Sequence, residues 1–97
     1  MRRLLATFIA CLSCQAWAAG ADYQLTPLAI AEGVYSFVGE LADFNPSNGG
    51  NIVNTGFIVG TEGVVVIDTG PSRRYGEQMR AAIARITPKP IALVINT

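Results

Sequence analysis

The chain has 97 residues, a formal net charge of zero and no histidine. This length is enough for one domain and no more. Without histidine, the chain lacks the commonest general base and the commonest metal-ligating side chain. The balanced charge provides no electrostatic basis for binding nucleic acid, so we expect none.

The first 18 residues carry the three parts of a secretory signal peptide. Arg2 and Arg3 are followed by an almost wholly apolar run at residues 4–12, and Ala16 and Ala18 are the small residues of a cleavage site. The run is shorter than the about 20 residues that span a bilayer. We therefore expect cleavage after Ala18, a secreted or periplasmic protein, and no stable membrane anchor after cleavage.

Both cysteines, Cys11 and Cys14, lie inside this segment. Their C-x-x-C spacing can indicate a redox or metal-binding pair, but their place in or beside the apolar run indicates that they belong to the signal peptide. The cleaved chain would then contain no disulfide and no thiolate ligand. An uncleaved anchor and lipid attachment at Cys14 stay open as alternatives.

The first half of the remaining chain has strand character. Residues 20–26 are polar with little pattern, and residues 27–31 and 34–38 flank a Glu-Gly turn, which predicts a hairpin or one bent strand. Residues 41–50 concentrate turn residues and predict a mobile loop. Residues 51–59 predict the next strand, in which Gly56 indicates a bulge or a close approach of another backbone.

Four consecutive β-branched residues at 64–67 predict a strand buried on both faces, because a half-exposed strand would alternate. It should pair with 51–59 across a tight turn. Ser72 is the expected N-cap of an amphipathic helix, which Thr87 and Pro88 end. Its apolar face is expected to consist of Tyr75, Met79, Ala82, Ile83 and Ile86. The arginines of this helix lie mostly off that face and indicate a solvated surface.

Residues 91–95 are a second continuous apolar run and should lie parallel to 64–67, because a helix connects the two. The predicted fold class is thus α/β, with two β-hairpins, one amphipathic helix and one further parallel strand. Both parallel strands end at the same sheet edge, where α/β folds build their sites. The candidate site residues at that edge are Asp68, Thr69, Gly70, Asn96 and Thr97. Because domains seldom end on a buried parallel strand, we interpret the chain as a fragment.

From about residue 33 to residue 97 the sequence resembles the opening of a metallo-β-lactamase-fold hydrolase. The matching segments are Gly33-Val34-Tyr35, Gly50-Asn51-Ile52, Gly56-Phe57-Ile58-Val59-Gly60, Gly63-Val64-Val65-Val66-Ile67-Asp68-Thr69-Gly70 and Leu93-Val94-Ile95-Asn96-Thr97. In that family a zinc-binding His-x-His-x-Asp-His motif comes next. Residues 51–60 and 68–76, with the signal peptide, also resemble periplasmic members associated with quinoprotein relay systems and sulfur oxidation.

The resemblance implies an αβ/βα sandwich, of which residues 19–97 are an incomplete first part. It implies a parent hydrolase that uses zinc-activated hydroxide on a small-molecule substrate, with zinc bound in the parent and not by this chain. Asp68 would be a supporting carboxylate that orients the loop after Thr97, and Gly70 would allow that loop to approach closely. Thr69 and Asn96 would support the same site. The chain itself is assigned no catalytic residue and no metal ligand, and we expect it to be inactive alone.

Three other interpretations are open. Asp68-Thr69-Gly70 matches the catalytic motif of aspartic proteases, although a helix follows at once and Pro71 replaces the small residue usual there. The chain could also be a small periplasmic binding or interaction domain without catalysis. Asp68 could be a plain helix-entry carboxylate that binds nearby backbone N–H groups.

Overall fold

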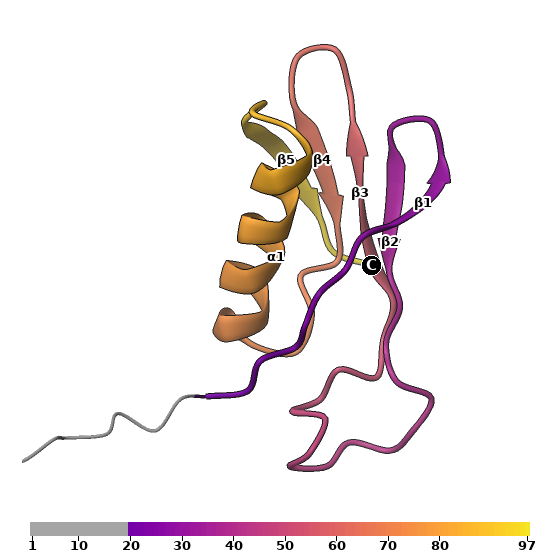
Figure 1. The fold of residues 1–97 in the computed structure, drawn as a ribbon, viewed down its shortest axis with the longest axis vertical. Coiled ribbons are helices and arrows are strands. Elements are labelled where there is room, and N and C mark those ends of the chain that lie inside the picture. The colour runs from indigo at the N-terminus through magenta and orange to yellow at the C-terminus, as the bar shows by residue number, and fades with distance from the viewer. Residues whose placement is uncertain (1–19) are drawn as a thin grey trace, which may run out of the picture.

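The computed structural model describes residues 20–97, which form a five-stranded sheet with one helix against one face (Figure 1). The strands are β1 (Leu28–Ala31), β2 (Val34–Phe37), β3 (Thr55–Val59), β4 (Val64–Ile67) and β5 (Ile91–Ile95), and α1 (Arg73–Ile86) connects the last two. Strand order in the sheet follows the sequence. Neighbours are antiparallel except β4 and β5, which are parallel. The α/β fold class, both hairpins and the parallel strand are confirmed, whereas the predicted signal peptide lies outside the described residues.

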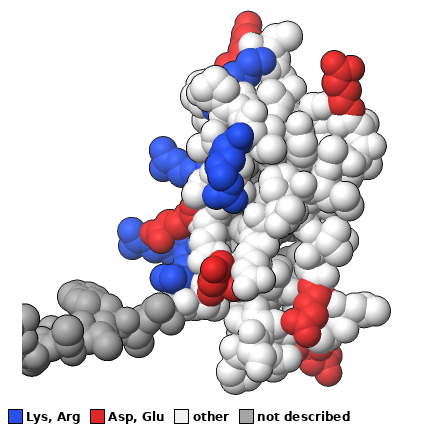
Figure 2. All heavy atoms as spheres, in the orientation of Figure 1, with Lys and Arg blue, Asp and Glu red and all other residues white. Residues whose placement is uncertain are grey.

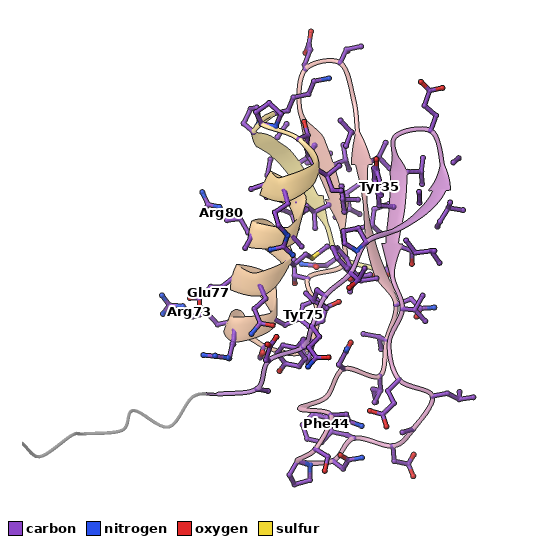
Figure 3. The ribbon with its side chains drawn as sticks, in the orientation of Figure 1. Tyr35, Phe44, Arg73, Tyr75, Glu77 and Arg80 are labelled. Carbon is purple, nitrogen blue, oxygen red and sulfur yellow. The ribbon has the colours of Figure 1, made fainter. Side chains whose placement is uncertain are left out.

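Helix α1 begins and ends where the sequence predicts. The Ser72 hydroxyl accepts a hydrogen bond from the backbone N–H of Tyr75 at 3.1 Å, and the N–H of Thr87 donates to the carbonyl of Ile83. Of the predicted apolar face, four residues are buried, but Ile86 in the last turn is exposed. Basic side chains cover the outer surface of α1 (Figure 2), and those of Arg73 and Arg80 point away from the sheet (Figure 3).

The hydrophobic core lies between α1 and one face of the sheet. Phe57 is at its centre, stacked on Tyr35 with ring centroids 4.8 Å apart and tilted against Phe37 at 5.7 Å. Leu25 also belongs to the core, although it comes from the segment that shows little pattern in the sequence. That segment runs along the open side of the helix and sheet (Figure 1).

The other face of the sheet is not covered by any described residue. In β4 only Val64 and Val66 are buried, while Val65 and Ile67 are partly exposed, and all five residues of β5 are exposed. The expectation that β4 is buried on both faces is therefore wrong for residues 20–97. The expectation that residues 91–95 form a buried strand is wrong as well. The physical reason is that α1 covers β4 on one side only, and β5, at the edge of the sheet, is exposed on both of its faces.

The connection from β2 to β3 also differs from expectation. Strand β3 begins at Thr55 rather than at residue 51, because the Asn54 side chain accepts a hydrogen bond from the N–H of Gly39 at 2.9 Å. Gly56 keeps its register with Ser36, so no bulge forms there. A Cβ atom at Gly56 would lie 2.7 Å from the carbonyl oxygen of Tyr35, which confirms the alternative of close backbone approach.

The loop before β3 is closed by its own side chains. Asn45 and Asn48 exchange hydrogen bonds between side-chain carbonyl and backbone N–H, at 3.1 and 2.9 Å. Asn48 is buried and also accepts a bond from the N–H of Gly50. Within residues 20–97, no helix has the length and apolar character that a membrane span requires.

Candidate site at the carboxyl edge of the parallel strands

Asp68 directly follows β4 and has an unusual backbone conformation. Its φ of 60° lies in the left-handed region, which aspartate tolerates better than most residues other than glycine. Its N–H donates to the carbonyl of Ile95 at 2.8 Å, which fixes it against the end of β5. The turn thus directs the Asp68 side chain toward the chain that leaves β5.

The carboxylate of Asp68 is bound by Thr97. The Thr97 N–H donates to Oδ1 at 2.7 Å, and the Thr97 hydroxyl lies 2.9 Å from Oδ1 and 2.8 Å from Oδ2. The backbone bond, followed by the hydroxyl bond, lowers the pKa of Asp68 below its ordinary value, against a smaller opposing effect of desolvation. Asp68 is therefore an ionised acceptor at neutral pH, suited to holding the segment at Thr97 in one orientation.

These contacts argue against two of the alternatives. The first turn of α1 is capped by Ser72 and not by Asp68, so the helix-entry interpretation is wrong. An aspartic protease needs two carboxylates that share a proton. Asp68 instead faces the hydroxyl and N–H of Thr97, and its pKa is lowered.

The structure brings all five predicted residues to one edge of the sheet. The Thr69 hydroxyl donates to the side-chain carbonyl of Asn96 at 3.3 Å, beside the contact between Asp68 and Thr97. The five predicted residues, together with Val53 and Asn54, line an open cleft of about 500 Å³.

Val53 and Asn54 also line the cleft, but the sequence analysis did not predict them as site residues. A signal for them was present, because an antiparallel hairpin places the start of β3 beside the end of β4. They line the same cleft as the turn at residues 68–70.

Gly70 has a steric role that the sequence did not reveal. Its φ is 74°, and a Cβ atom there would overlap the ring of Tyr75. Its close contact in the described residues is therefore with Tyr75 of α1, and the close approach of a loop after Thr97 stays a prediction. Tyr75 is fully buried, and its hydroxyl lies 2.8 Å from that of Thr55.

The described residues do not fit a zinc centre. Zinc sites use three or four His, Cys, Asp or Glu ligands, and residues 20–97 contain no group of three or more such side chains placed to hold a metal. Both oxygens of Asp68 are already engaged by Thr97. Any zinc site in a protein that contains this domain would need ligands from other residues.

Comparison with known families identifies the family to which this part of the chain belongs. The model of the metallo-beta-lactamase superfamily matches residues 48–97, slightly more than half of the chain. The matched segment contains β3, β4, α1, β5 and every residue that lines the cleft. No curated protein matches the chain. The chain belongs to the metallo-β-lactamase superfamily.

Proposed function

We propose that residues 20–97 are the first part of a zinc-dependent hydrolase domain in which Asp68 supports a metal site built by other residues. The observation that carries the proposal is the contact between Asp68 and Thr97, made at the edge where two parallel strands end. The superfamily is mostly hydrolytic and usually zinc-dependent. We assign no step of the hydrolysis to this chain, since its described residues do not fit a zinc centre.

The role proposed for Asp68 is to orient the backbone at Thr97. An ionised carboxylate that accepts an N–H and a hydroxyl makes charge-assisted hydrogen bonds, which are stronger than neutral ones. Groups of this kind outside a metal's ligand set fix the orientation of the ligands and tune the site. Thr69 and Asn96, which are hydrogen-bonded to each other, would hold the same edge.

The uncovered face of the sheet supports the proposal of an incomplete domain. Ile58, Val65 and Leu93 are cross-strand neighbours on that face, and Ile58 and Leu93 are 38% and 52% exposed. A sheet normally buries its apolar face against a second layer. We propose that this layer comes from residues outside 20–97, in a sandwich typical of the superfamily.

We further propose a secreted or periplasmic location, with the signal peptide cleaved after Ala18. The substrate would be a small molecule, and no nucleic acid would bind. We also propose an association with quinoprotein relay systems or sulfur oxidation, which the sequence resemblance of residues 51–60 and 68–76, together with the predicted signal peptide, supports. Mass spectrometry of the exported protein tests the cleavage: a mature chain that begins at Ala19 supports it, and retention of residues 1–18 contradicts it.

The functional proposal is tested with the gene. An in-frame His-x-His-x-Asp-His segment after the codon of Thr97 would supply the expected ligands, and the longer product should bind zinc and hydrolyse ester, thioester or amide substrates. Asp68→Asn should impair that activity, while Asp43→Asn, in an exposed loop, should leave it unchanged. A longer product that contains the motif but binds no zinc would contradict the proposal.

A small binding domain is the second candidate, and one observation favours it. Strand β1 is at the edge of the sheet, and its Leu28 and Ile30 are 58% and 65% exposed. Such an edge can pair with an extended segment of a partner. Cooperative unfolding of the processed chain as a monomer, with no ligand motif encoded downstream, would favour this candidate over the hydrolase.

A further inference from the structure

We propose that Tyr75 and Thr55 are a positioning pair that holds the two walls of the Asp68 cleft in a fixed relation. Residues 68–70 and residues 53–54 both line this cleft, and we call them its two walls. The inference rests on the proposed function, because it concerns the same cleft. It assigns the two residues a role in positioning Asp68 and no contact with a substrate.

The first step is the contact between Tyr75 and the turn. The ring of Tyr75 occupies the space that a Cβ atom of Gly70 would need, so ring and backbone are in direct contact. The N–H of Tyr75 donates to the Ser72 hydroxyl at 3.1 Å, which ties the same residue to the end of the turn. Tyr75, labelled in Figure 3, is fully buried, so an inward movement of the turn would have to displace a residue of the core.

The second step is the contact between Tyr75 and the other wall. Its hydroxyl and that of Thr55 lie 2.8 Å apart in a buried hydrogen bond. Thr55 directly follows Asn54 and is paired with Phe37 in the sheet. A buried hydroxyl that loses its partner is costly, so this bond is strongly favoured over separation of the two groups. One side chain therefore contacts one wall with its ring and the other wall with its hydroxyl.

A second tyrosine supports the first from the outside. The ring of Tyr23 meets that of Tyr75 edge to face, with centroids 5.1 Å apart. The Tyr23 hydroxyl donates to the carbonyl of Gly49 and lies 3.0 Å from the Ser72 hydroxyl. The ring of Tyr75 thus contacts both Gly70 and Tyr23, which restricts its position.

The test uses the exported, processed chain and reads the state of Asp68 directly. The variants are Tyr75→Phe and Thr55→Val, which each remove one hydroxyl, and Thr55→Ser, which retains it. Tyr35→Phe is the control, because that ring packs on Phe57 in the core, and Tyr35 is not among the residues that line the cleft. NMR follows the titration of the Asp68 carboxyl and the hydrogen exchange of the Thr97 amide.

We expect Tyr75→Phe and Thr55→Val each to raise the pKa of Asp68 toward its ordinary value and to speed exchange of the Thr97 amide. The double variant should add little to either single one, because both remove the same hydrogen bond. Thr55→Ser and Tyr35→Phe should leave both measurements unchanged. If the unfolding midpoint falls in the two hydroxyl-deleting variants while the Asp68 titration and Thr97 exchange stay as in the wild type, the pair is only part of the core and the proposal is overturned.

The experiment can reject the proposed role of the pair even if one variant fails to fold or the protein has no hydrolase activity. If Tyr75→Phe does not fold, the comparison of Thr55→Val with Thr55→Ser answers the same question. The measurements need neither zinc nor substrate, so they do not depend on hydrolysis. Failure of the longer protein to hydrolyse any substrate would refute the proposed function, whereas an unaltered Asp68 titration would refute the positioning pair alone.

Discussion

Thr97 binds the carboxylate of Asp68 through both its backbone N–H, at 2.7 Å, and its hydroxyl, at 2.8–2.9 Å. The two residues are 29 positions apart in the sequence and follow adjacent parallel strands. With the bond from the Asp68 N–H to the carbonyl of Ile95, the ends of β4 and β5 are joined by backbone and side chain together. Both residues of this junction line the cleft.

Replacing Asp68 with asparagine should destabilise this junction. The asparagine side chain would keep one carbonyl acceptor but would lose the negative charge and the second acceptor oxygen. We expect a lower free energy of unfolding in urea and faster hydrogen exchange at the Thr97 amide. Asp43→Asn, which changes the same charge in an exposed loop, is the matched control. Equal effects of the two substitutions would show that the junction contributes nothing specific.

The same junction predicts how stability depends on pH at the acidic end. The hydrogen bonds from Thr97 lower the pKa of Asp68 in the folded chain below its value in the unfolded chain. Its contribution is therefore fully present above about pH 4, the ordinary range of an aspartate, and is lost as the pH falls through the lower folded pKa. Urea unfolding between pH 7 and pH 2 should show the wild type and Asp68→Asn converging at low pH. A difference that persists unchanged at pH 2 would contradict the assignment.

The one-sided core predicts unequal effects of neighbouring substitutions in β3. Phe57→Ala should lower the free energy of unfolding by about 3–5 kcal/mol, because it removes a buried ring and leaves a cavity. Ile58→Ala changes the next residue, which lies on the uncovered face, and should lower the free energy of unfolding much less. Phe57→Leu, which retains more volume, should be intermediate and keeps the comparison possible if Phe57→Ala does not fold.

A comparison in the longer protein extends this test. If a second layer covers Ile58 there, Ile58→Ala should become markedly more destabilising than in the 97-residue chain. An equally small cost in both proteins would show that the face of the sheet at Ile58 stays uncovered.

Local patterns in the sequence were sufficient for most of the fold. The continuous apolar runs predicted β4 and β5, and Ser72 and Thr87 marked the ends of α1 where the structure has them. These elements follow from short-range chemistry, such as capping and β-branched side chains. The convergence of Asp68 and Thr97 could also be anticipated, since parallel strands joined by a helix end at the same edge.

Features that depend on long-range contacts were not predictable. Leu25 reaches the core from a segment without pattern, where Ala21 accepts hydrogen bonds from Arg74 and Gln78 at 2.7 and 2.9 Å. The start of β3 was displaced because the side chain of Asn54 replaces a backbone acceptor. Burial of β4 on both faces was inferred from its continuous apolar residues. Such a run indicates that a strand is buried, but it does not show which other residues cover each face.

The raised pKa of Tyr75 predicts that the free energy of unfolding decreases at alkaline pH. Burial raises the pKa of the Tyr75 hydroxyl, and the hydrogen bond with Thr55 opposes this less strongly. A group whose pKa is raised on folding contributes stability below its unfolded pKa, about 10, and that contribution is lost as the pH rises through the folded value. The measurement is a pH titration of the tyrosinate absorbance of the wild type and of Tyr75→Phe. The difference between the two curves reports the ionisation of Tyr75, which should occur above about pH 10. An ionisation of Tyr75 below its ordinary pKa would contradict the burial argument.

The last prediction concerns zinc. The processed chain should bind no zinc in a stoichiometric site, because the sequence contains no histidine and residues 20–97 hold no cluster of three ligands. Calorimetry and metal analysis after dialysis measure this directly, with Asp68→Ala as the control. Weak binding that is unchanged in Asp68→Ala would be nonspecific and consistent with the prediction. One zinc per chain that is lost in Asp68→Ala would make Asp68 a ligand, and its role would then be to bind the metal rather than to orient Thr97.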